Sequence, residues 1–382
     1  MAHPDLRRQD SRSTHVAVPQ TTVYGTPTSR SALWEDEPCT RMPRAHRGGW
    51  MHTVNADTLG SEGVWVDPVW RVRVHLTSLE RELLATWWVR RLAFVSHAGA
   101  ASITTTQTYT RLEHSLGTLA LVAHFAPDDH AARATALLHD VGHLPFSHTL
   151  EGIAGLDHHT IGHARIDELG SVLKRHGIAA ERVIAIDAGE VPSPLRSAPG
   201  CMKLDHLDSF VRSGQAHGRT VIPPPEILAS CRLVDGGVDT DAETAAELTR
   251  LVIAEARAQR AAPNVVPVAV LRSLVLDALT DPAAPIDPAA LATMTDGELW
   301  SALLCAPSTR EQARAFRRNP GAWQLLKHDD ETADPKAEPL EHLIARGYLS
   351  LPTISGAPTT NSDVQVLERD LPARYRIVRV AA

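Results

Sequence analysis

Residues 137–152 read LLHDVGHLPFSHTLEG, and this stretch decides the fold and the chemistry that we predict. It ends an apolar helical pattern, places His139 beside Asp140, and is then interrupted by Gly142 and Pro145, which break a helix. Neighbouring helical residues lie only about 100° apart around the axis, so this imidazole and this carboxylate can reach one cation. We therefore predict that one helix supplies two ligands to a metal ion, which needs further ligands from elsewhere.

A second histidine, His114, lies near the start of the preceding helix. Thr110 and Glu113 have the spacing of a capping box, so we expect this helix to begin directly after the threonine. The short link at residues 127–129 makes the helix antiparallel to the one that carries His139. The pattern therefore predicts that His114 contributes a third ligand.

The fourth ligand should be a carboxylate on a later helix. Asp205 is the best candidate, and Asp208 lies one turn further on. Two neutral imidazoles and two carboxylates neutralise a divalent ion and leave positions for water and substrate. Such a set suits Mn, Fe, Co, Ni or Zn, and Mg less well. A metal in this set acidifies its bound water and polarises phosphoryl oxygens.

The composition excludes several classes of function. The chain has 382 residues, 43% of them hydrophobic, and a net charge of −7, which argues against a dedicated duplex nucleic-acid binder. No apolar run approaches the roughly 18 to 20 residues that span a bilayer, and the N-terminus lacks the apolar core of a secretory signal. Four cysteines without a CxxC pair indicate neither a disulfide framework nor a zinc ribbon. We therefore expect a cytoplasmic protein without a membrane segment.

Histidine is the informative residue type. Nine of the 20 histidines lie between Arg111 and His163, where an even spread would put about three. Imidazole groups bind metals and transfer protons near neutral pH, so we expect the chemistry of the protein in this window.

The sequence predicts a mainly α protein with minor β elements. We expect a polar, partly disordered N-terminal extension, a core with the metal site, and a helical C-terminal region ending in a small mixed α/β segment, at residues 1–60, 61–220 and 221–382. Apolar spacing predicts helices at 78–95, with Ser78 as N-cap, at 131–143 and at 201–214. Alternating patterns predict strands at 65–76 and 374–380.

Three motifs in this order resemble the HD superfamily of metal-dependent phosphohydrolases. They are RLEHSLGTLALVAH at 111–124, LLHDVGHLPFSHTLEG at 137–152 and LDHLDSFVR at 204–212. The likeness is closest to the deoxynucleoside triphosphate triphosphohydrolase branch. It covers roughly residues 64–215 and continues more weakly through 294–320. The resemblance implies an HD-domain helical bundle.

The resemblance also implies roles for single residues. It implies metal ligands at His114, His139, Asp140 and Asp205. His143, His148 and His158 match histidines that line the phosphate site, where they bind phosphate or transfer protons. Glu151 matches an acidic residue that orients a histidine, and we expect it to hold His148 for proton transfer.

Arg111 matches an arginine that contacts a substrate phosphate. It lies three residues before His114, so both side chains project from one helix face. A guanidinium beside a metal ion is a suitable clamp for a phosphate group.

The substrate-binding residues depart from the triphosphohydrolase pattern. Ser209 and Ser213 stand where that branch has a tyrosine and an aspartate that recognise the sugar, and Ser96 and His97 alter the loop before the first histidine. Residues 250–265 offer no aromatic and basic stretch to pack on the nucleotide. We assign Ser209 and Arg212 to substrate binding and expect the same metal chemistry on a different phosphorylated substrate.

The leading hypothesis is an enzyme that hydrolyses a phosphoester or phosphoanhydride, most of all in a nucleotide. Two alternatives stay open. The first is a di-iron enzyme that uses dioxygen, with extra ligands from His143, His148, His158 and His159. The second is a non-catalytic nucleotide-binding regulatory module. By resemblance, a homo-oligomer is also expected.

Overall fold

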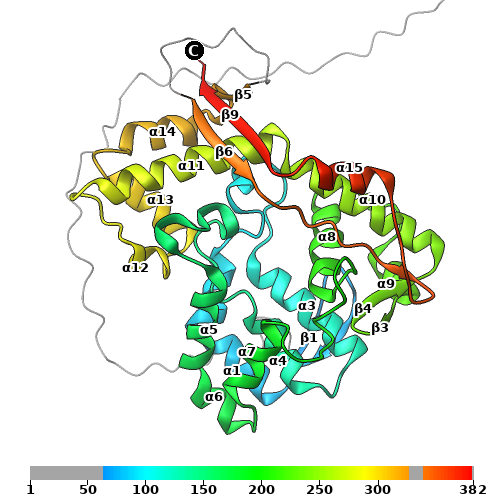
Figure 1. The fold of residues 1–382 in the computed structure, drawn as a ribbon. Coiled ribbons are helices and arrows are strands. Elements are labelled where there is room, and N and C mark those ends of the chain that lie inside the picture. The colour runs from blue at the N-terminus through cyan, green and yellow to red at the C-terminus, as the bar shows by residue number, and fades with distance from the viewer. Residues whose placement is uncertain (1–62, 327–338, 381–382) are drawn as a thin grey trace, which may run out of the picture. The chain divides into compact units, whose positions relative to one another are not determined.

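The structure, a computed structural model, describes residues 63–326 and 339–380 (Figure 1). The predicted N-terminal extension lies outside these residues. The chain divides into the units Met1–Met51 and His52–Ala382, and every described residue belongs to the second. Within it, 15 α-helices and a few short strands confirm the prediction of a mainly α protein with minor β elements.

The elements follow one another along the chain with these bounds. The α-helices are α1 (Ser78–Ala85), α2 (Trp87–Arg91), α3 (Arg111–Phe125), α4 (His130–Leu138), α5 (His158–Glu168), α6 (Gly170–Arg175), α7 (Ala180–Asp187), α8 (Leu204–Ala216), α9 (Pro224–Ser230), α10 (Ala242–Gln259), α11 (Ala262–Thr280), α12 (Pro288–Leu291), α13 (Asp296–Cys305), α14 (Arg310–Arg318) and α15 (Ser362–Arg369). The strands are β1 (Val64–Val66), β2 (Arg73–His75), β3 (Arg232–Val234), β4 (Gly237–Thr240), β5 (Trp323–Leu326), β6 (Leu340–Ile344), β7 (Thr353–Ile354), β8 (Ala357–Pro358) and β9 (Ala373–Arg379). Short 3-10 helices are η3 (Leu92–Phe94), η4 (Gly99–Ile103), η5 (Ser147–Leu150), η6 (Ile153–Gly155) and η7 (Pro320–Ala322).

The strands form three small sheets. β1 and β2 pair antiparallel, which confirms the predicted strand pair at 65–76. The second sheet has the order β3-β4-β7-β8, in which β4 and β7 run parallel. The third has the order β5-β9-β6, and its central strand is the predicted strand at the C-terminal end.

Two of the predicted helices are shorter than expected. The helix predicted over 78–95 ends at Ala85, because Thr86 is extended and both its amide and its hydroxyl donate to the carbonyl of Leu83, at 3.0 and 2.6 Å. Its N-cap is Thr77, which forms a capping box with Glu80, and not the predicted Ser78. The helix predicted over 131–143 ends at residue 138, so the histidine–aspartate pair lies in the turn directly after it.

α3 lies between α4 and α8 and holds the site together. It begins with the predicted capping box of Thr110 and Glu113. Gly117 allows α8 to approach closely, because a Cβ there would lie 2.1 Å from Oδ1 of Asp208 and from Nη2 of Arg212. α8 thereby reaches the face of α3 that carries His114.

The apolar residues form two clusters. One gathers side chains of α1, α3, α4, α8 and α10, and the other gathers those of α11, α13, α14, β5 and β9. α11 is long and apolar enough to span a membrane by length and composition, which corrects the expectation that no segment reaches this length. Half of its apolar window is buried within the protein. Val270, Leu271 and Leu274 of α11 lie in the second cluster.

Candidate metal and phosphate site

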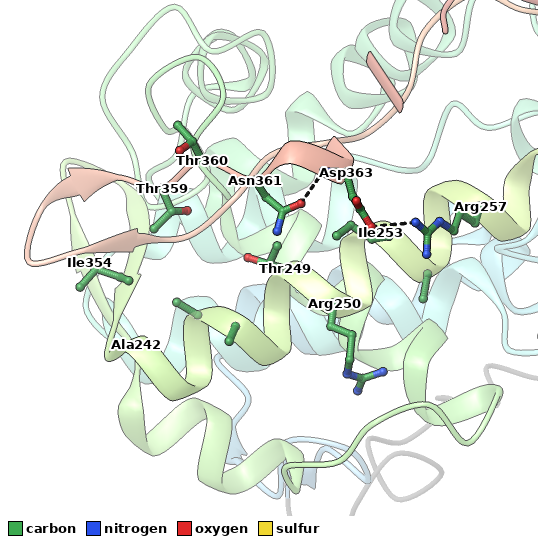
Figure 2. Close-up of a pocket in the computed structure, with 13 residues that line it drawn as sticks. Ala242, Thr249, Arg250, Ile253, Arg257, Ile354, Thr359, Thr360, Asn361 and Asp363 are labelled. Carbon is green, nitrogen blue, oxygen red and sulfur yellow. Dashed lines mark hydrogen bonds and ion pairs between the residues drawn. The ribbon is translucent and has the colours of Figure 1, made fainter. Parts of the chain in front are cut away.

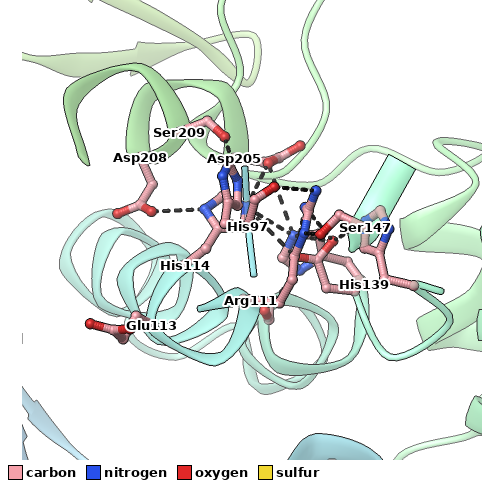
Figure 3. A network of polar contacts seen from close by, with 12 residues as sticks. His97, Arg111, Glu113, His114, His139, Ser147, Asp205, Asp208 and Ser209 are labelled. Carbon is pink, nitrogen blue, oxygen red and sulfur yellow. Dashed lines mark hydrogen bonds and ion pairs between the residues drawn. The ribbon is translucent and has the colours of Figure 1, made fainter. Parts of the chain in front are cut away.

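The four predicted metal ligands lie near one another where α3, the end of α4 and α8 meet, and Figure 3 shows three of them, His114, His139 and Asp205. Nε2 of His114 lies 3.0 Å from Oδ1 of Asp205 and 3.4 Å from Nε2 of His139. The carboxylate of Asp140 lies 3.5 Å from Nε2 of His139 and 3.9 Å from Nε2 of His114. Donor atoms of His114, His139 and Asp205 therefore lie within 4.8 Å of one another, and the carboxylate of Asp140 lies beside the two imidazoles.

Hydrogen bonds fix which nitrogen each imidazole presents to this point. Nδ1 of His139 lies 2.9 Å from the carbonyl of Ala136, one turn earlier, and must donate to it. Nδ1 of His114 lies 2.8 Å from Oδ2 of Asp208, which can only accept. Both rings therefore direct Nε2 to the cluster, as outer hydrogen bonds do for metal-binding histidines.

Asp208 lies in a buried polar network behind His114. Nε1 of Trp70 donates to it at 2.7 Å, and Arg212 donates to it from Nε at 3.0 Å and from Nη2 at 2.8 Å. Nη2 of Arg212 also lies 2.8 Å from Asp67. Burial raises the pKa of Asp208, but Arg212 and the hydrogen bond from His114 outweigh it and lower this pKa to about 2.

Arg212 does not lie where the substrate-binding role that we predicted for it would require. Its guanidinium is buried between Asp67 and Asp208, and the residue is not part of the cavity wall. In this position the side chain fixes the carboxylate that orients His114.

The carboxylates of Asp140 and Asp205, the two predicted ligands, are ionised although protein surrounds them. Burial opposes ionisation, but Arg111, His139 and His143 hold the pKa of Asp140 well below its usual value. Burial likewise opposes the ionisation of Asp205, whose pKa is lowered chiefly by Lys203. Nζ of Lys203 lies 2.7 Å from Oδ2 of Asp205, a contact that the sequence did not reveal.

Three histidines form a second cluster beside the first. The rings of His143 and His158 stack with centroids 4.4 Å apart, and the ring of His148 stands edge-on to both, at 4.6 and 4.9 Å. Nε2 of His143 lies 3.0 Å from Oδ1 of Asp140, which joins the two clusters. The predicted phosphate-site histidines are therefore adjacent to the predicted metal ligands.

Glu151 contacts a different histidine from the one that we expected. Its Oε2 lies 2.9 Å from Nδ1 of His158, and its Oε1 accepts from the backbone amide of the same residue at 3.2 Å. Glu151 therefore orients His158 and not His148. The ring of His148 is exposed to the cavity, yet desolvation by the surrounding protein, together with His143 and Arg111, holds its pKa well below its usual value, so this imidazole is neutral at neutral pH.

Arg111 connects the metal ligands to the neighbouring loops. Its Nη1 lies 3.1 Å from Oδ2 of Asp140, its Nε donates to Oγ of Ser147 at 2.8 Å, and its Nη2 donates to the carbonyl of His97 at 3.3 Å. A guanidinium has five N–H donors, so Nη2 has a second hydrogen besides the one that it donates to His97. The side chain is buried and held in place before any ligand binds.

The turn that carries His148 has a strained backbone held from far away in the sequence. Phe146 and Ser147 both have positive φ, 55° and 54°. The amide of Phe146 donates to Oδ1 of Asp296 at 2.6 Å, and Oδ2 of the same carboxylate accepts from the amide of Ser96 at 2.8 Å. Asp296, the first residue of α13, therefore fixes the turn between His143 and His148.

A cavity of about 450 Å³ opens onto both clusters. Of the predicted substrate residues, Ser209 lies in its wall, where its hydroxyl is 3.0 Å from Nε2 of His97. Ser213 lies outside it and donates to Glu255 at 2.5 Å. The sequence did not single out several other residues of the wall, which are Gln107, Lys203, Gln259, Asn264, His342, Arg346 and Tyr348.

A second hollow lies apart from this site, between α10 and the chain that leads into α15 (Figure 2). Arg257 of α10 pairs with Asp363 at 2.8 Å, and Asn361 accepts from the amide of Asp363 at 2.9 Å. None of the predicted site residues lines this hollow. Its contacts fasten the C-terminal segment to α10.

Comparison with known protein families finds a match in the N-terminal half of the described residues. The HD domain family matches residues 111–191. This range includes His114, His139 and Asp140, and it ends before Asp205. Residues 111–191 are therefore similar to HD domains, in agreement with the resemblance seen in the sequence motifs.

Three relatives are informative in sequence. A metal-dependent phosphohydrolase of Cordyceps militaris is 27% identical over 258 residues, which cover 62% of this chain and 71% of that protein. Uncharacterized proteins of Methanocaldococcus jannaschii and Bacillus subtilis are 36% and 35% identical over 166 and 114 residues. The matched segments cover 35% and 26% of the length of these two proteins.

One solved structure is similar along most of the chain. A phosphohydrolase from Bacteroides thetaiotaomicron superposes with a TM-score of 0.63 and covers 84% of this chain and 100% of its own. The two sequences are 16% identical, so this likeness concerns the fold alone.

Proposed function

We propose that this HD-domain protein is a metal-dependent phosphohydrolase that acts on a nucleotide or a related phosphate ester or anhydride. One observation carries the proposal. His139, Asp140 and Asp205, the cation Arg111 and the histidines His143, His148 and His158 all line one cavity of about 450 Å³. A site of this size holds a small organic phosphate and combines cations, metal ligands and proton carriers.

The donor set fits a divalent metal ion. His114 and His139 direct Nε2 to the cluster, and Asp140 and Asp205 are ionised, so the ligands neutralise two positive charges. Nitrogen and oxygen donors together suit Mn, Fe, Co, Ni or Zn, and Mg less well. Such a metal supplies a polarised phosphoryl oxygen and an acidified water at this position.

The surrounding side chains bind the phosphate and stabilise its charge. Arg111 and Lys203 each lie beside one ligand carboxylate, at 3.1 and 2.7 Å, so two cations flank the position of the phosphate. Cations fixed before substrate binds stabilise the charge on phosphoryl oxygens without further reorganisation. His148 lies in the same wall as a neutral imidazole, whereas the one N–H of His143 donates to Asp140 and fixes that carboxylate.

We assign proton transfer to His158, because it has the partner that such a role requires. Glu151 accepts from Nδ1 of His158 at 2.9 Å, which fixes the ring and leaves Nε2 for the reaction. A carboxylate behind an imidazole also stabilises the protonated ring. His158 would give its proton to the oxygen of the leaving group.

A chromatographic screen tests the proposal. Nucleoside mono-, di- and triphosphates and cyclic nucleotides are incubated with Mn, Fe, Co, Ni, Zn and Mg in turn. Release of triphosphate would identify a deoxynucleoside triphosphate triphosphohydrolase-like reaction, and release of orthophosphate from a monophosphate would identify a nucleotidase. No turnover with any metal would overturn the proposal.

Two variants make the screen specific to the site. Asp140→Asn removes one ligand charge and should abolish turnover while the circular dichroism spectrum stays that of the wild type. Asp363→Asn is the matched control, because this carboxylate belongs to the surface pair with Arg257, away from the site. Turnover retained by a folded Asp140→Asn variant would exclude this site.

One observation favours a second candidate, oxidation by dioxygen at two irons. Ring nitrogens of His143, His148 and His158 lie within 4.8 Å of one another and could hold a second metal. Two irons per chain with dioxygen uptake would support this reaction. One metal per chain with phosphate release would exclude it.

A further inference from the structure

The cavity has a wall that comes from the C-terminal part of the chain. Residues of β6 and of the segment after it line the cavity although they lie far from the metal ligands in sequence. We call residues 340–351 the strap. In Figure 1 the chain leaves β6 and passes α8 on its way to the sheet that contains β4.

The strap is fixed at its first end by a sheet. β6 pairs antiparallel with β9, in a register that places His342 opposite Tyr375. β9 also pairs with β5, so β6 is the edge of a three-stranded sheet whose strands contact α11.

The strap is fixed at its second end beside the last metal ligand. The amide of Met202 donates to the carbonyl of Leu351 at 2.8 Å, and the amide of Leu351 donates to the carbonyl of Gly200 at 2.9 Å. Oγ of Ser350 lies 2.7 Å from Nδ1 of His206, the residue after Asp205. The strap residues between these two anchors therefore have a defined place over the cavity.

Between the anchors, the strap brings an aromatic ring and a cation to the site. The ring of Tyr348 lies 6.1 Å from that of His148 and 5.6 Å from that of His206, measured between centroids. Arg346 is exposed and lines the same cavity. The aromatic and basic wall that residues 250–265 lack is thus supplied from a different part of the chain.

We infer that the strap recognises the part of the substrate that carries the phosphate, and that Tyr348 and Arg346 are its specificity-determining residues. The inference rests on the proposed function and names its substrate class, a phosphate attached to a group with an aromatic ring, such as a nucleoside. Tyr348 stacks on the aromatic ring, and Arg346 attracts the anionic substrate. Stacking of a base on an aromatic side chain is strong enough to change affinity by tenfold or more.

Calorimetric titration tests the inference without relying on turnover. The probes are the four ribonucleoside 5′-monophosphates and ribose 5-phosphate, which has the same phosphate and sugar without a base. In the presence of Mn²⁺, the wild type should bind at least one nucleotide tenfold more tightly than ribose 5-phosphate. Tyr348→Leu should remove that preference, Tyr348→Phe should keep it, and Arg346→Ala should weaken every probe several-fold.

Matched controls lie on the neighbouring strand. Arg374→Ala changes an exposed arginine that pairs with the strap in the sheet but does not line the cavity, and it should leave all affinities unchanged. Equal affinity of the wild type for nucleotides and ribose 5-phosphate would overturn the inference. So would a preference that survives in Tyr348→Leu.

The two proposals fail in different ways. If the titrations show a preference for nucleotides but no metal supports phosphate release, the role given to the strap is supported and the phosphohydrolase proposal is rejected. Phosphate release without any preference for an aromatic group would support the phosphohydrolase and reject the strap.

Discussion

Asp208 accepts a hydrogen bond from Nδ1 of His114 at 2.8 Å, through the ring nitrogen that does not face Asp205. The two aspartates lie one helical turn apart on α8, and both touch the same imidazole from different sides. This relationship separates their roles. Under the proposed function Asp205 would bind the metal, whereas Asp208 fixes the ring of His114.

Asp208→Asn should therefore weaken metal binding without removing a ligand. The variant keeps the shape of the side chain but loses the charge that holds His114 and balances the buried Arg212. Removal of such an outer partner typically costs about 10- to 100-fold in metal affinity. Titration of Mn²⁺ into the folded variant measures the change, with Asp363→Asn as control. Unchanged affinity would contradict the role given to Asp208.

Glu151→Gln should reduce kcat more than KM. The amide cannot stabilise a protonated His158, and loss of a general acid typically costs about 10²- to 10⁴-fold in rate. The pH profile of kcat should also change with the substitution, because the carboxylate that contacts the proton-transferring ring is replaced by a neutral amide. A double-mutant cycle with a His158 variant checks the partner. If Glu151 acted through His148 instead, Glu151→Gln would change the pH profile of the His158 variant as much as it changes that of the wild type.

Gly117→Ala should destabilise the protein. Its Cβ would lie 2.1 Å from two buried atoms, on Asp208 and Arg212, and neither side chain has space to move. Such overpacking costs about 1 to 3 kcal/mol or more. Gly297→Ala is the matched control in α13, because a Cβ there meets no atom within 4 Å, and it should be neutral or stabilising. Urea denaturation of both variants checks the difference.

The free energy of unfolding should fall in mild acid because of His342. Burial and the nearby Arg272 lower the pKa of this imidazole to about 4. The unfolded chain, with a pKa near 6.5, therefore binds the proton first, so stability is lost as the pH falls below about 6.5. The loss at pH 5 should be about 2 kcal/mol. His342→Gln should reduce the difference in unfolding free energy between pH 7.5 and pH 5 by that amount, and an unchanged difference would refute it.

Local rules were sufficient to predict much of the site. The capping box at Thr110 fixes where α3 begins, and the three-residue spacing then puts Arg111 and His114 on one face. The adjacency of His139 and Asp140 needs no knowledge of the fold. These predictions depend only on helix geometry, which the chain carries in its own sequence.

Other parts of the site depend on how distant segments pack. Glu151 lies three residues from His148 and seven from His158, yet the left-handed turn at Phe146 and η6 bring it to the second. The backbone between Glu151 and His158 is not a continuous helix, so helical spacing could not predict their contact, and the sequence favoured His148 instead. Arg212 belongs to the same motif as Asp205, LDHLDSFVR at 204–212. Its side chain nevertheless lies at the close contact of α8 with α3, paired with Asp208, and not in the cavity wall.

The sequence by itself determined the types of residue that do the chemistry, because the ligands, the cation and the histidines stand in short motifs with helical or turn spacing. The tertiary structure alone decided that Asp208 contacts His114 from the opposite side, that Glu151 contacts His158, and that Tyr348 reaches the cavity. The physical reason is the range of the forces involved. Helix caps and helical periodicity act within a few residues, whereas the strap and the contact of Asp208 with His114 depend on segments that only folding brings together.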